Sequence, residues 1–450
     1  MTQIDPAFLP DRMRSSPRVA ALMEAARGED GLWLVGGAVR DLLLGADPKD
    51  LDVLVEGDAG AAAGRMAARL GGEVEATGRF DTATVRAPEV AFDLARARTE
   101  TYPRPGALPE VAPATLEEDL PRRDFTVNAL AAALHPDRLG ELRAADGALD
   151  DLRARVLRVF HPSSFRDDPT RLLRLARLAA RLRFAPDAET AALAREAVAA
   201  GALGTVSGPR LGAELRLLAR DHAALAAARW AQESGVLASL HPSLHFDEGL
   251  TARALALLPS PLVLLASLAC RFERGELRAW LGRLGFEAGD RDAIAPAAAD
   301  APTLAAELGA ARRPSEIAAA ARGHPDAAIA LAGALGAGEA ASATRGRSTP
   351  AVPPAGAVGA EGAASATRGR STPAVPPAGS LGAEGAARRW LEELRDMRLE
   401  IGGADLVAAG VPEGPAIGRA LAAALRVKLD GEACGREEEL RAALSTLEPS

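Results

Sequence analysis

The chain has 450 residues, a formal net charge of −8 and 48% hydrophobic residues. This length exceeds what one hydrophobic core usually serves, so we expect several domains, and the acidic balance argues against a protein whose whole surface binds nucleic acid. Two cysteines, Cys270 and Cys434, are too few and too far apart for a disulfide framework or a zinc site, which favours a reducing compartment.

Membrane insertion is not expected either. The first residues, MTQIDPAFLPDRMR, lack the apolar core of a signal peptide. The most apolar run, Ala254–Cys270, is interrupted by Pro259 and Pro261, and neither half is long enough to span a bilayer. The sequence therefore predicts a soluble, cytoplasmic protein with no membrane partner, and no obligate protein partner is evident.

The first clear elements surround a pair of glycines. A short amphipathic helix over Pro17–Arg27 precedes an apolar strand over Leu32–Val35. Gly36 and Gly37 then permit a tight turn and close approach of the backbone to a ligand, and a helix over Ala38–Leu44 follows. The turn offers backbone N–H groups to phosphate.

Arg40, one turn into that helix, could add a charge-assisted contact to a triphosphate, and Gly37 would lie beside it. A solvated position of Arg40 on the helix surface is the alternative.

Two carboxylates, Asp50 and Asp52, accompany a second strand predicted over Leu51–Val55. Because side chains alternate across a strand, carboxylates two residues apart face the same side. They repel each other unless a cation lies between them, and hard oxygen ligands suit Mg²⁺. A glycine turn for phosphate, followed by a carboxylate pair for metal, is what nucleotidyl transfer requires. The alternative is an exposed Asp-x-Asp at a strand start, which is common by itself.

Strands and helices continue to alternate after this point, which predicts an α/β domain. A helix is expected over Ala59–Leu70, and paired strands over Thr82–Arg86 and Val90–Leu94. Asp93, on the second of these strands, is a candidate third metal ligand. Its pairing with a nearby arginine is the alternative.

A proline-rich loop is predicted over Thr99–Ala114. The segment Glu117–Leu134 follows, and its second half reads as an apolar helix that Arg123, Asp124 and Asn128 lead into. Asp124 or Asn128 could hydrogen-bond ribose hydroxyls. A helix cap with solvated arginines explains the same residues equally well.

Strand signals disappear after Val156, and helical patterns continue to about residue 335. The sequence SFRDDPTRLLRLARLAARLRF opens this part, with Asp168 as the N-cap and Pro169 in the first helical position. Arginines recur every three or four residues on one face of this helix: Arg171, Arg174, Arg177 and Arg181.

Asp168 and Arg171 lie three residues apart at the helix start and therefore on one face. A carboxylate can accept from an exocyclic amine, and a guanidinium can donate to a ring nitrogen. Cytosine and adenine present that pair, whereas guanine and uracil present the reverse. The two side chains could therefore admit CTP and ATP and reject GTP and UTP by leaving buried groups unpaired. The alternative is that Asp168 only caps the helix and Arg171 is exposed.

The last third of the chain contains a duplication. Residues 341–356 and 364–379 are identical copies of ASATRGRSTPAVPPAG, rich in small residues and proline. This composition predicts a disordered linker over 336–386. A helical pattern resumes from 387 to 450.

Several of these segments together resemble a known family. GGAVRDLLLG followed by DLD resembles the signature of polymerase-β-type nucleotidyltransferases, and more closely the class II tRNA nucleotidyltransferases and poly(A) polymerases. EEDLPRRDFTVNAL resembles the class II motif taken to sense the ribose. RDDPTRLLRLARLAARLRF resembles the motif EDxxR, in which protein side chains select the base, although Asp167 stands where glutamate is usual and Thr170 where an apolar residue is common.

The resemblance implies an α+β fold, with a polymerase-β-like head built on a mixed sheet and an all-α remainder. The domains it implies are a nucleotidyltransferase head over 1–158, a helical neck with the base-selecting helix over 159–225, a helical body over 226–335, the linker over 336–386 and a helical tRNA-binding tail over 387–450.

It also implies the reaction, the template-independent addition of CCA to the 3′ end of tRNA from CTP and ATP. Asp50 and Asp52 would be catalytic, and with Asp93 they would hold Mg²⁺. The nucleotide-binding residues would be Gly36, Gly37, Arg40, Arg123, Asp124, Asn128, Asp168, Arg171, Arg174 and Arg177. A poly(A) polymerase, an enzyme adding only CC or only A, and a non-catalytic RNA-binding relative are the alternatives.

Overall fold

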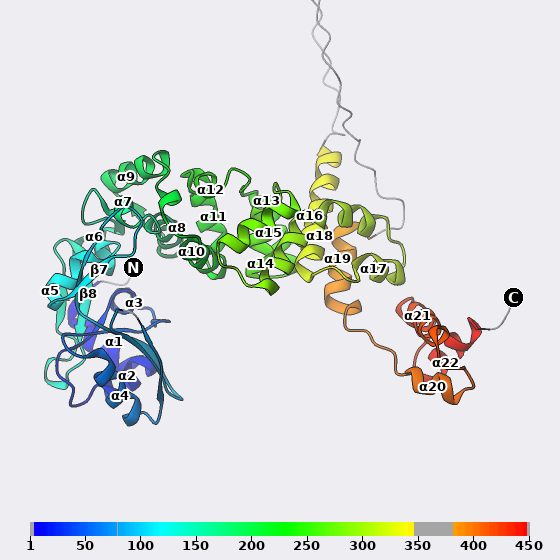
Figure 1. Cartoon of the computed structure of the whole chain (residues 1–450), viewed down its shortest axis with the longest axis horizontal. Helices are drawn as coiled ribbons and strands as arrows, with labels where there is room; N and C mark the ends of the chain where they lie inside the picture. Colours follow the sequence, from blue (N-terminus) through cyan, green and yellow to red (C-terminus); the bar gives the residue numbers. More distant parts are fainter. Residues whose placement is uncertain (1–3, 79, 346–380, 448–450) are drawn as a thin grey trace, which may run out of the picture. The chain divides into compact units, whose positions relative to one another are not determined.

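The computed structural model of the chain describes residues 4–78, 80–345 and 381–447 (Figure 1). Internal contacts divide the chain into two compact units, Met1–Leu240 and His241–Ser450. The first unit includes the predicted head and neck and the first residues of the predicted body. The finer domain boundaries stay predictions.

A mixed sheet of seven strands organises the first unit, in the order β3-β4-β5-β2-β1-β8-β9. The β2–β5 pair is parallel, and the other neighbours in this sheet are antiparallel. The strands are β1 (Leu32–Val35), β2 (Asp52–Val55), β3 (Glu73–Gly78), β4 (Thr82–Arg86), β5 (Ala91–Arg96), β8 (Leu130–Ala133) and β9 (Leu142–Ala144).

Helices of this unit cover one face of the sheet. α3 (Gly37–Leu43) contacts β1 and β8, and α4 (Ala59–Arg69) packs against β3, β4 and β5. α4 begins where the Asp58 carboxylate accepts a hydrogen bond from the backbone N–H of Ala61 at 2.8 Å. The other helices of the head are α1 (Leu9–Ser15), α2 (Pro17–Ala25), α5 (Leu116–Asp119) and α6 (Ala148–Ala154).

The opposite face is only partly covered. Leu116 and Leu120 pack with Trp33, Val35 and Leu54 in one buried cluster. The same face carries Asp52, because Asp52 and Leu54 alternate with Val53 along β2. The sheet thus presents carboxylates at the border of a hydrophobic cluster.

The predicted strands at Leu32–Val35 and Thr82–Arg86 are confirmed, and the strands at Leu51–Val55 and Val90–Leu94 shift by a residue or two at their ends. The loop predicted over Thr99–Ala114 is wrong at both ends, where β6 (Arg98–Thr101) and β7 (Glu110–Pro113) pair antiparallel. All four residues of β7 are exposed, so its sequence lacks the alternation of apolar and polar residues that predicts a half-buried strand.

The apolar helix predicted in the second half of Glu117–Leu134 is wrong. Thr126–Asn128 forms a single 3₁₀ turn, and Leu130–Ala133 is the strand β8, paired with both β1 and β9. Every residue of β8 is buried. A strand buried on both faces shows no alternation, and its alanines favour a helix by propensity alone, so tertiary pairing overrides the local signal.

Besides the seven-stranded sheet, the described residues of the first unit form helices and two small sheets, the β6–β7 pair and the parallel pair of β10 (Val156–Leu157) and β11 (Ala185–Pro186). Its further helices are α7 (Ser164–Asp167), α8 (Arg171–Leu182), α9 (Ala188–Ala199), α10 (Gly208–Arg220), α11 (Ala224–Glu233) and α12 (Val236–Leu240). The predicted N-cap at Asp168 is wrong, because α8 begins at Arg171 with Thr170 as its N-cap. Asp168 instead ends α7 in an extended conformation.

The described part of the second unit is helical, so the predicted fold class, a mixed-sheet head followed by helices, is confirmed. Its helices are α13 (Glu248–Leu257), α14 (Pro261–Leu268), α15 (Arg274–Arg283), α16 (Ala288–Ala310), α17 (Pro314–Ala321), α18 (Asp326–Arg345), α19 (Gly382–Arg389), a π-helical turn over Trp390–Leu394, α20 (Gly403–Ala408), α21 (Pro415–Leu429) and α22 (Arg436–Ser445).

α18 extends into the segment predicted to be a linker, and α19 begins before that segment ends. The rest of the predicted linker, 346–380, lies outside the described residues. Among the described residues, no helix combines the length and the apolar character needed to cross a bilayer.

Candidate active site

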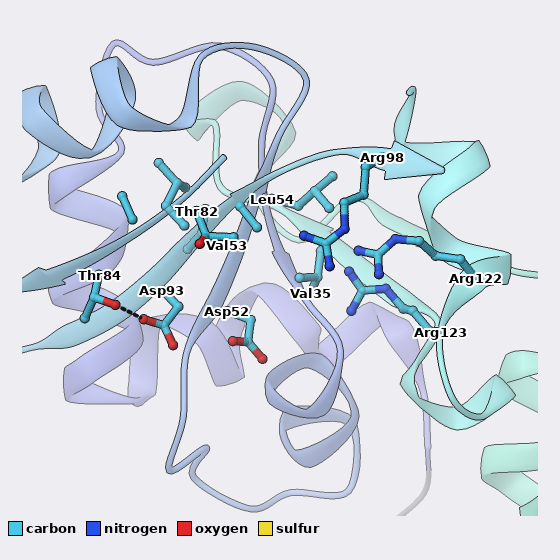
Figure 2. Close-up of a pocket in the computed structure, with 13 residues that line it drawn as sticks. Val35, Asp52, Val53, Leu54, Thr82, Thr84, Asp93, Arg98, Arg122 and Arg123 are labelled. Atoms are coloured by element: carbon cyan, nitrogen blue, oxygen red, sulfur yellow. Dashed lines mark hydrogen bonds between the residues drawn. The ribbon is translucent and has the colours of Figure 1, made fainter. Parts of the chain in front are cut away.

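One row of side chains crosses the open face of the sheet. In the parallel β2–β5 pair Asp52 lies opposite Asp93, in the β4–β5 pair Thr84 lies opposite Asp93, and in the β1–β2 pair Val35 lies opposite Asp52. Thr84 Oγ1 donates a hydrogen bond to Asp93 Oδ1 at 2.7 Å (Figure 2). The strand register therefore holds two carboxylates side by side.

Asp50 lies differently from the prediction. It precedes β2 in a bend rather than in the strand, so strand alternation does not place it beside Asp52. The charge of Asp50 is nevertheless close enough to affect the pKa of Asp52. Burial raises the pKa of Asp52, the charges of Asp93 and Asp50 raise it further, and Arg123 opposes the rise. Mutual repulsion of this kind is relieved by a bound cation.

The row borders two cavities of the first unit. The larger has a volume of about 1100 Å³ and the smaller about 360 Å³, and they share Asp52, Asp93, Arg122 and Arg123. Every site residue predicted from the sequence lines the larger cavity: Gly36, Gly37, Arg40, Asp50, Asp52, Asp93, Arg123, Asp124, Asn128, Asp168, Arg171, Arg174 and Arg177. Segments far apart in the sequence therefore meet around one space.

The backbone of the glycine turn packs closely against neighbouring residues. Gly36 has φ +72°, which other residues adopt with strain, and a Cβ there would lie 3.0 Å from Arg123 Nη1. The Gly36 N–H donates to the carbonyl of Leu130 at 2.9 Å. Burial lowers the pKa of Arg123, and Asp119 counteracts this.

Arg40 is not the solvated residue considered as an alternative, because it is only 1% exposed. Its Nε and Nη2 donate to Asp41 Oδ1 at 2.9 and 2.6 Å, and its Nη1 donates to Asn128 Oδ1. Burial lowers the pKa of Arg40, which Asp41 opposes. Arg40 thus fixes the orientation of the Asn128 amide within the cavity wall.

Asp124 connects the head to helix α8. Asp124 Oδ2 accepts from Arg174 Nε and Nη2 at 2.9 and 2.6 Å, and Oδ1 accepts from Asn128 Nδ2 at 2.9 Å. Burial alone would raise the pKa of Asp124, but Arg174 and Asn128 hold it well below its usual range. The carboxylate is therefore ionised and oriented at neutral pH.

Arg171 is buried, so the alternative of an exposed arginine is wrong. Its Nη1 donates to Ser164 Oγ at 2.5 Å and its Nη2 to the carbonyl of Arg122 at 2.9 Å. Asp168 Oδ1 accepts from Arg210 Nη2 at 2.7 Å and from Thr170 Oγ1 at 2.6 Å. Hydrogen bonds from neighbouring residues therefore hold both Asp168 and Arg171 in place in the cavity wall.

Several supporting residues have no counterpart in the sequence prediction. Glu214 on α10 accepts from Arg177 at 3.2 Å and lies 3.6 Å from Arg174. Asp119, with no exposed surface, accepts from Arg122 and Arg123. A single acidic residue on a helix carries no sequence signal for such a role. Arg181, which also lines the larger cavity, continues the predicted arginine stripe.

Comparison with known proteins finds a family match for the head. Residues 32–158 match the family model described as the poly(A) polymerase head domain. Residues 32–158 are therefore similar to the head domain of poly(A) polymerases. The resemblance predicted from the sequence is confirmed for this part of the chain.

Curated relatives in this family have several names. The chain is 44% identical to an A-adding tRNA nucleotidyltransferase of Aquifex aeolicus over 42% of this chain and 23% of that protein. It is 45% identical to a CC-adding tRNA nucleotidyltransferase of Deinococcus radiodurans over 44% of this chain and 52% of that protein. A multifunctional CCA protein of Xanthomonas campestris is 39% identical over 50% of this chain and 53% of that protein. The chain spans about half or less of each of these relatives.

Solved structures of the family cover more of the chain. The Thermotoga maritima CCA-adding enzyme complexed with tRNA covers 99% of this chain and 100% of its own, with a TM-score of 0.69 and 26% identity. A CCA-adding enzyme in complex with CTP covers 100% of both chains, with a TM-score of 0.70 and 25% identity.

Nucleotidyltransferases of this family generally use divalent metal ions. In the part of the chain that the structure describes, no three His, Cys, Asp or Glu side chains gather into a preformed metal centre. The three predicted ligands Asp50, Asp52 and Asp93 therefore do not form a three-residue metal centre. The strand register holds only Asp52 beside Asp93. The negative charge of Asp93 contributes to the raised pKa of the neighbouring Asp52, and two adjacent carboxylates are oxygen donors suited to a divalent cation.

Proposed function

We propose that this protein adds the C and A nucleotides of the terminal CCA to the 3′ end of tRNA, from CTP and ATP and without a nucleic-acid template. The observation that carries the proposal is the larger of the two cavities beside Asp52 and Asp93, which every residue predicted for this chemistry lines. The names of the relatives and of the solved complexes support it. Because tRNA and nucleoside triphosphates are its substrates, the proposed location is the cytoplasm.

In the proposed reaction the 3′-hydroxyl of tRNA attacks the α-phosphate of CTP or ATP, and pyrophosphate leaves. Asp50, Asp52 and Asp93 would hold Mg²⁺. When bound, the metal lowers the pKa of the attacking hydroxyl and neutralises the leaving group. The remaining contribution of the protein is positioning of both substrates and exclusion of the wrong ones.

The ribose and triphosphate would be held by the head. Gly36 and Gly37 form the wall where the triphosphate approaches the backbone. Asn128 uses one amide hydrogen for Asp124 and its oxygen for Arg40, so its second amide hydrogen can meet a ribose hydroxyl. Such a contact would favour ribonucleotides over deoxyribonucleotides.

The base would be selected by Asp168 and Arg171. The described hydrogen bonds to the Asp168 carboxylate all end on Oδ1, so Oδ2 can accept from an exocyclic amine. Arg171 uses Nη1 and Nη2 for Ser164 and Arg122, and its Nε–H can donate to a ring nitrogen. Because both groups are held in place, a base with the reverse pattern leaves them unpaired.

Replacing Arg171 with alanine is expected to relax base choice. Preference for CTP and ATP over GTP and UTP should fall by about tenfold to a hundredfold, the range for losing one discriminating hydrogen bond. The measurement is incorporation from competing nucleotides, with thermal melting to confirm folding because Arg171 also anchors Ser164. Arg166→Ala is the control, because Arg166 is an exposed arginine of α7 that lies outside the larger cavity. Unchanged selectivity in Arg171→Ala would contradict its assignment.

A second candidate is an enzyme that adds only A or only CC, since relatives with those names share 41–45% identity with the chain. The test uses purified protein with tRNA ending before CCA, after C and after CC, supplied with each nucleotide alone and with CTP and ATP together. Completion of CCA supports the first proposal, and extension by only CC or only A supports the second. Long A tails would indicate a poly(A) polymerase, and tRNA binding without extension would indicate a non-catalytic relative.

A further inference from the structure

Asp50 is the predicted metal ligand that lies outside the sheet. It precedes β2 in a bend, whereas Asp52 and Asp93 lie opposite each other in the β2–β5 pair. Fixing a residue in one backbone conformation costs conformational entropy, and a cation that must fix its own ligand binds more weakly for that reason. The contacts that hold the bend therefore determine how well Asp50 can serve as a ligand.

On its C-terminal side the bend is held by β5. The N–H of Asp93 donates to the carbonyl of Leu51 at 2.9 Å, and Leu51 is buried. This contact fixes the peptide group that follows Leu51. It does not fix the peptide group through which the chain enters Asp50.

The other side of the bend is held by the N-terminal helix α2. Arg18, in the first turn of α2, donates through Nη1 to the carbonyl of Pro48 at 3.3 Å and to the carbonyl of Lys49. Because the peptide group is planar, a fixed Lys49 carbonyl also fixes the position of the Asp50 Cα atom. Contacts from α2 and from β5 thus enclose Asp50 on both sides.

Two further contacts join the connection between α3 and β2 to the N-terminal helices. Ser16 is the N-cap of α2, and its Oγ donates to Asp47 Oδ1 at 2.5 Å. Arg12 Nη1, in α1, donates to the carbonyls of Leu42 and Leu43 at 2.8 and 2.7 Å, where α3 leaves its last carbonyls without partners in the helix. The connection is therefore held at its start, near its middle and directly before Asp50.

We propose that Arg18 is a positioning residue of the active site, which orients Asp50 for a divalent cation through the Lys49 carbonyl. Arg18 lines neither the larger nor the smaller cavity, so it acts on the reaction only through the bend. Residues that orient a metal ligand contribute to metal affinity although they touch neither the metal nor the substrate. The inference rests on the proposed function, in which Asp50 holds Mg²⁺.

A competing explanation is that Arg18 only attaches α2 to the rest of the head. In that case its loss lowers the melting temperature and leaves the metal affinity of the folded protein unchanged. Arg12 fits this explanation, because its partners Leu42 and Leu43 belong to the buried end of α3 and not to the bend. The two arginines therefore predict different effects on metal binding.

The test replaces Arg18 with methionine, which keeps an unbranched apolar stem and the helix propensity but donates no hydrogen bond. We expect the Kd of Mn²⁺ to rise about tenfold, the lower end of the range for losing a group that orients a metal ligand. The measurement is the EPR signal of free Mn²⁺, titrated with the full chain in the presence of a non-reactive CTP analogue.

Extension of tRNA gives a second readout of the same variant. The Mg²⁺ concentration for half-maximal extension should rise by a similar factor of about ten, because more metal is needed to fill the weakened site. The value of kcat at saturating Mg²⁺ and the KM for tRNA should stay within about twofold of the wild type.

Three matched variants separate positioning from attachment. Arg18→Lys keeps the charge and can donate to one carbonyl, so its Mn²⁺ Kd should lie between those of wild type and Arg18→Met. Arg14→Met is the control, because Arg14 is exposed on α1 and pairs with Asp11 of the same helix. Arg12→Met should lower the melting temperature and leave the Mn²⁺ Kd unchanged.

Hydrogen exchange followed by mass spectrometry locates the change. In Arg18→Met we expect faster amide exchange in peptides that cover residues 44–51, because the bend opens more often without its contact to α2. Peptides that cover β1 and β8 should exchange at wild-type rates. This readout requires neither metal nor substrate.

Weaker Mn²⁺ binding and faster exchange of the bend in Arg18→Met, with wild-type values in Arg14→Met, support the inference. An unchanged Mn²⁺ Kd in folded Arg18→Met, an equal rise in Arg12→Met, or a wild-type chain that binds no Mn²⁺ overturns it. If the wild-type chain extends no tRNA, the proposed function fails, and Mn²⁺ binding with hydrogen exchange still decides whether Arg18 positions Asp50.

Discussion

Replacing Asp52 with asparagine is expected to reduce nucleotide incorporation by about a thousandfold or more, the scale for losing a group that stabilises charge in the transition state. Asp52 lies opposite Asp93 across the parallel strand pair and borders both cavities. An amide of the same shape removes the negative charge and leaves the strand in place. The measurement is single-turnover extension of tRNA with CTP and ATP.

The affinity of the Asp52→Asn variant for tRNA should remain close to that of the wild type, because RNA binding depends on phosphate contacts over a much larger surface. Asp146→Asn is the control, since Asp146 is exposed and lies outside both cavities. Turnover retained in Asp52→Asn would contradict the assignment of the carboxylate row.

Replacing Asp124 with asparagine should produce the largest loss of stability among the site variants. The carboxylate accepts two hydrogen bonds from Arg174 and one from Asn128 in a buried position. Removing one partner of a buried ion pair leaves the other uncompensated. We expect a loss of about 2 to 3 kcal/mol in the free energy of unfolding, below the usual cost, because Arg174 is partly exposed and keeps Glu214 nearby. This free energy is measured by denaturant titration, from the first unfolding transition.

The pH dependence gives a second readout of the same interaction. The pKa of Asp124 is lowered on folding, so its contribution to stability is present above its unfolded pKa of about 4 and disappears as the pH falls toward the folded value. The free energy of unfolding of Asp124→Asn should therefore be lower than that of the wild type at neutral pH. It should also fall less than that of the wild type as the pH decreases. Asp150→Asn, which removes an exposed ion pair to Arg153, should change neither. Equal stability of Asp124→Asn and wild type at pH 7 would contradict this account.

The core of the fold could be predicted from local patterns. The strand at Leu32–Val35, the glycine turn and the strand ending at Val55 each have a distinct signal, and their spacing fixes how the chain returns to the sheet. The helix–strand error at Leu130–Ala133 arose because buried alanines favour either element, and only pairing with β1 and β9 decides between them.

The residues that line the larger cavity could also be predicted, because the motifs name residues that must meet around one nucleotide. The hydrogen-bond partners of these residues could not be predicted. Arg40 turned out to be buried against Asn128, a residue 88 positions away, and Asp168 is held by Arg210 from another helix. Asp50 lies in a bend because β2 starts at Asp52. Such partners depend on tertiary packing, which no local pattern encodes.

The most direct test of the central claim is a crystal structure of the chain with Mg²⁺ and a non-reactive analogue of CTP or ATP. The account predicts the triphosphate beside Gly36 and Gly37, the metal on Asp52 with Asp50 or Asp93, and the Watson–Crick edge of the base facing Asp168 and Arg171. A triphosphate bound outside the larger cavity, or a base turned away from that pair, would contradict it.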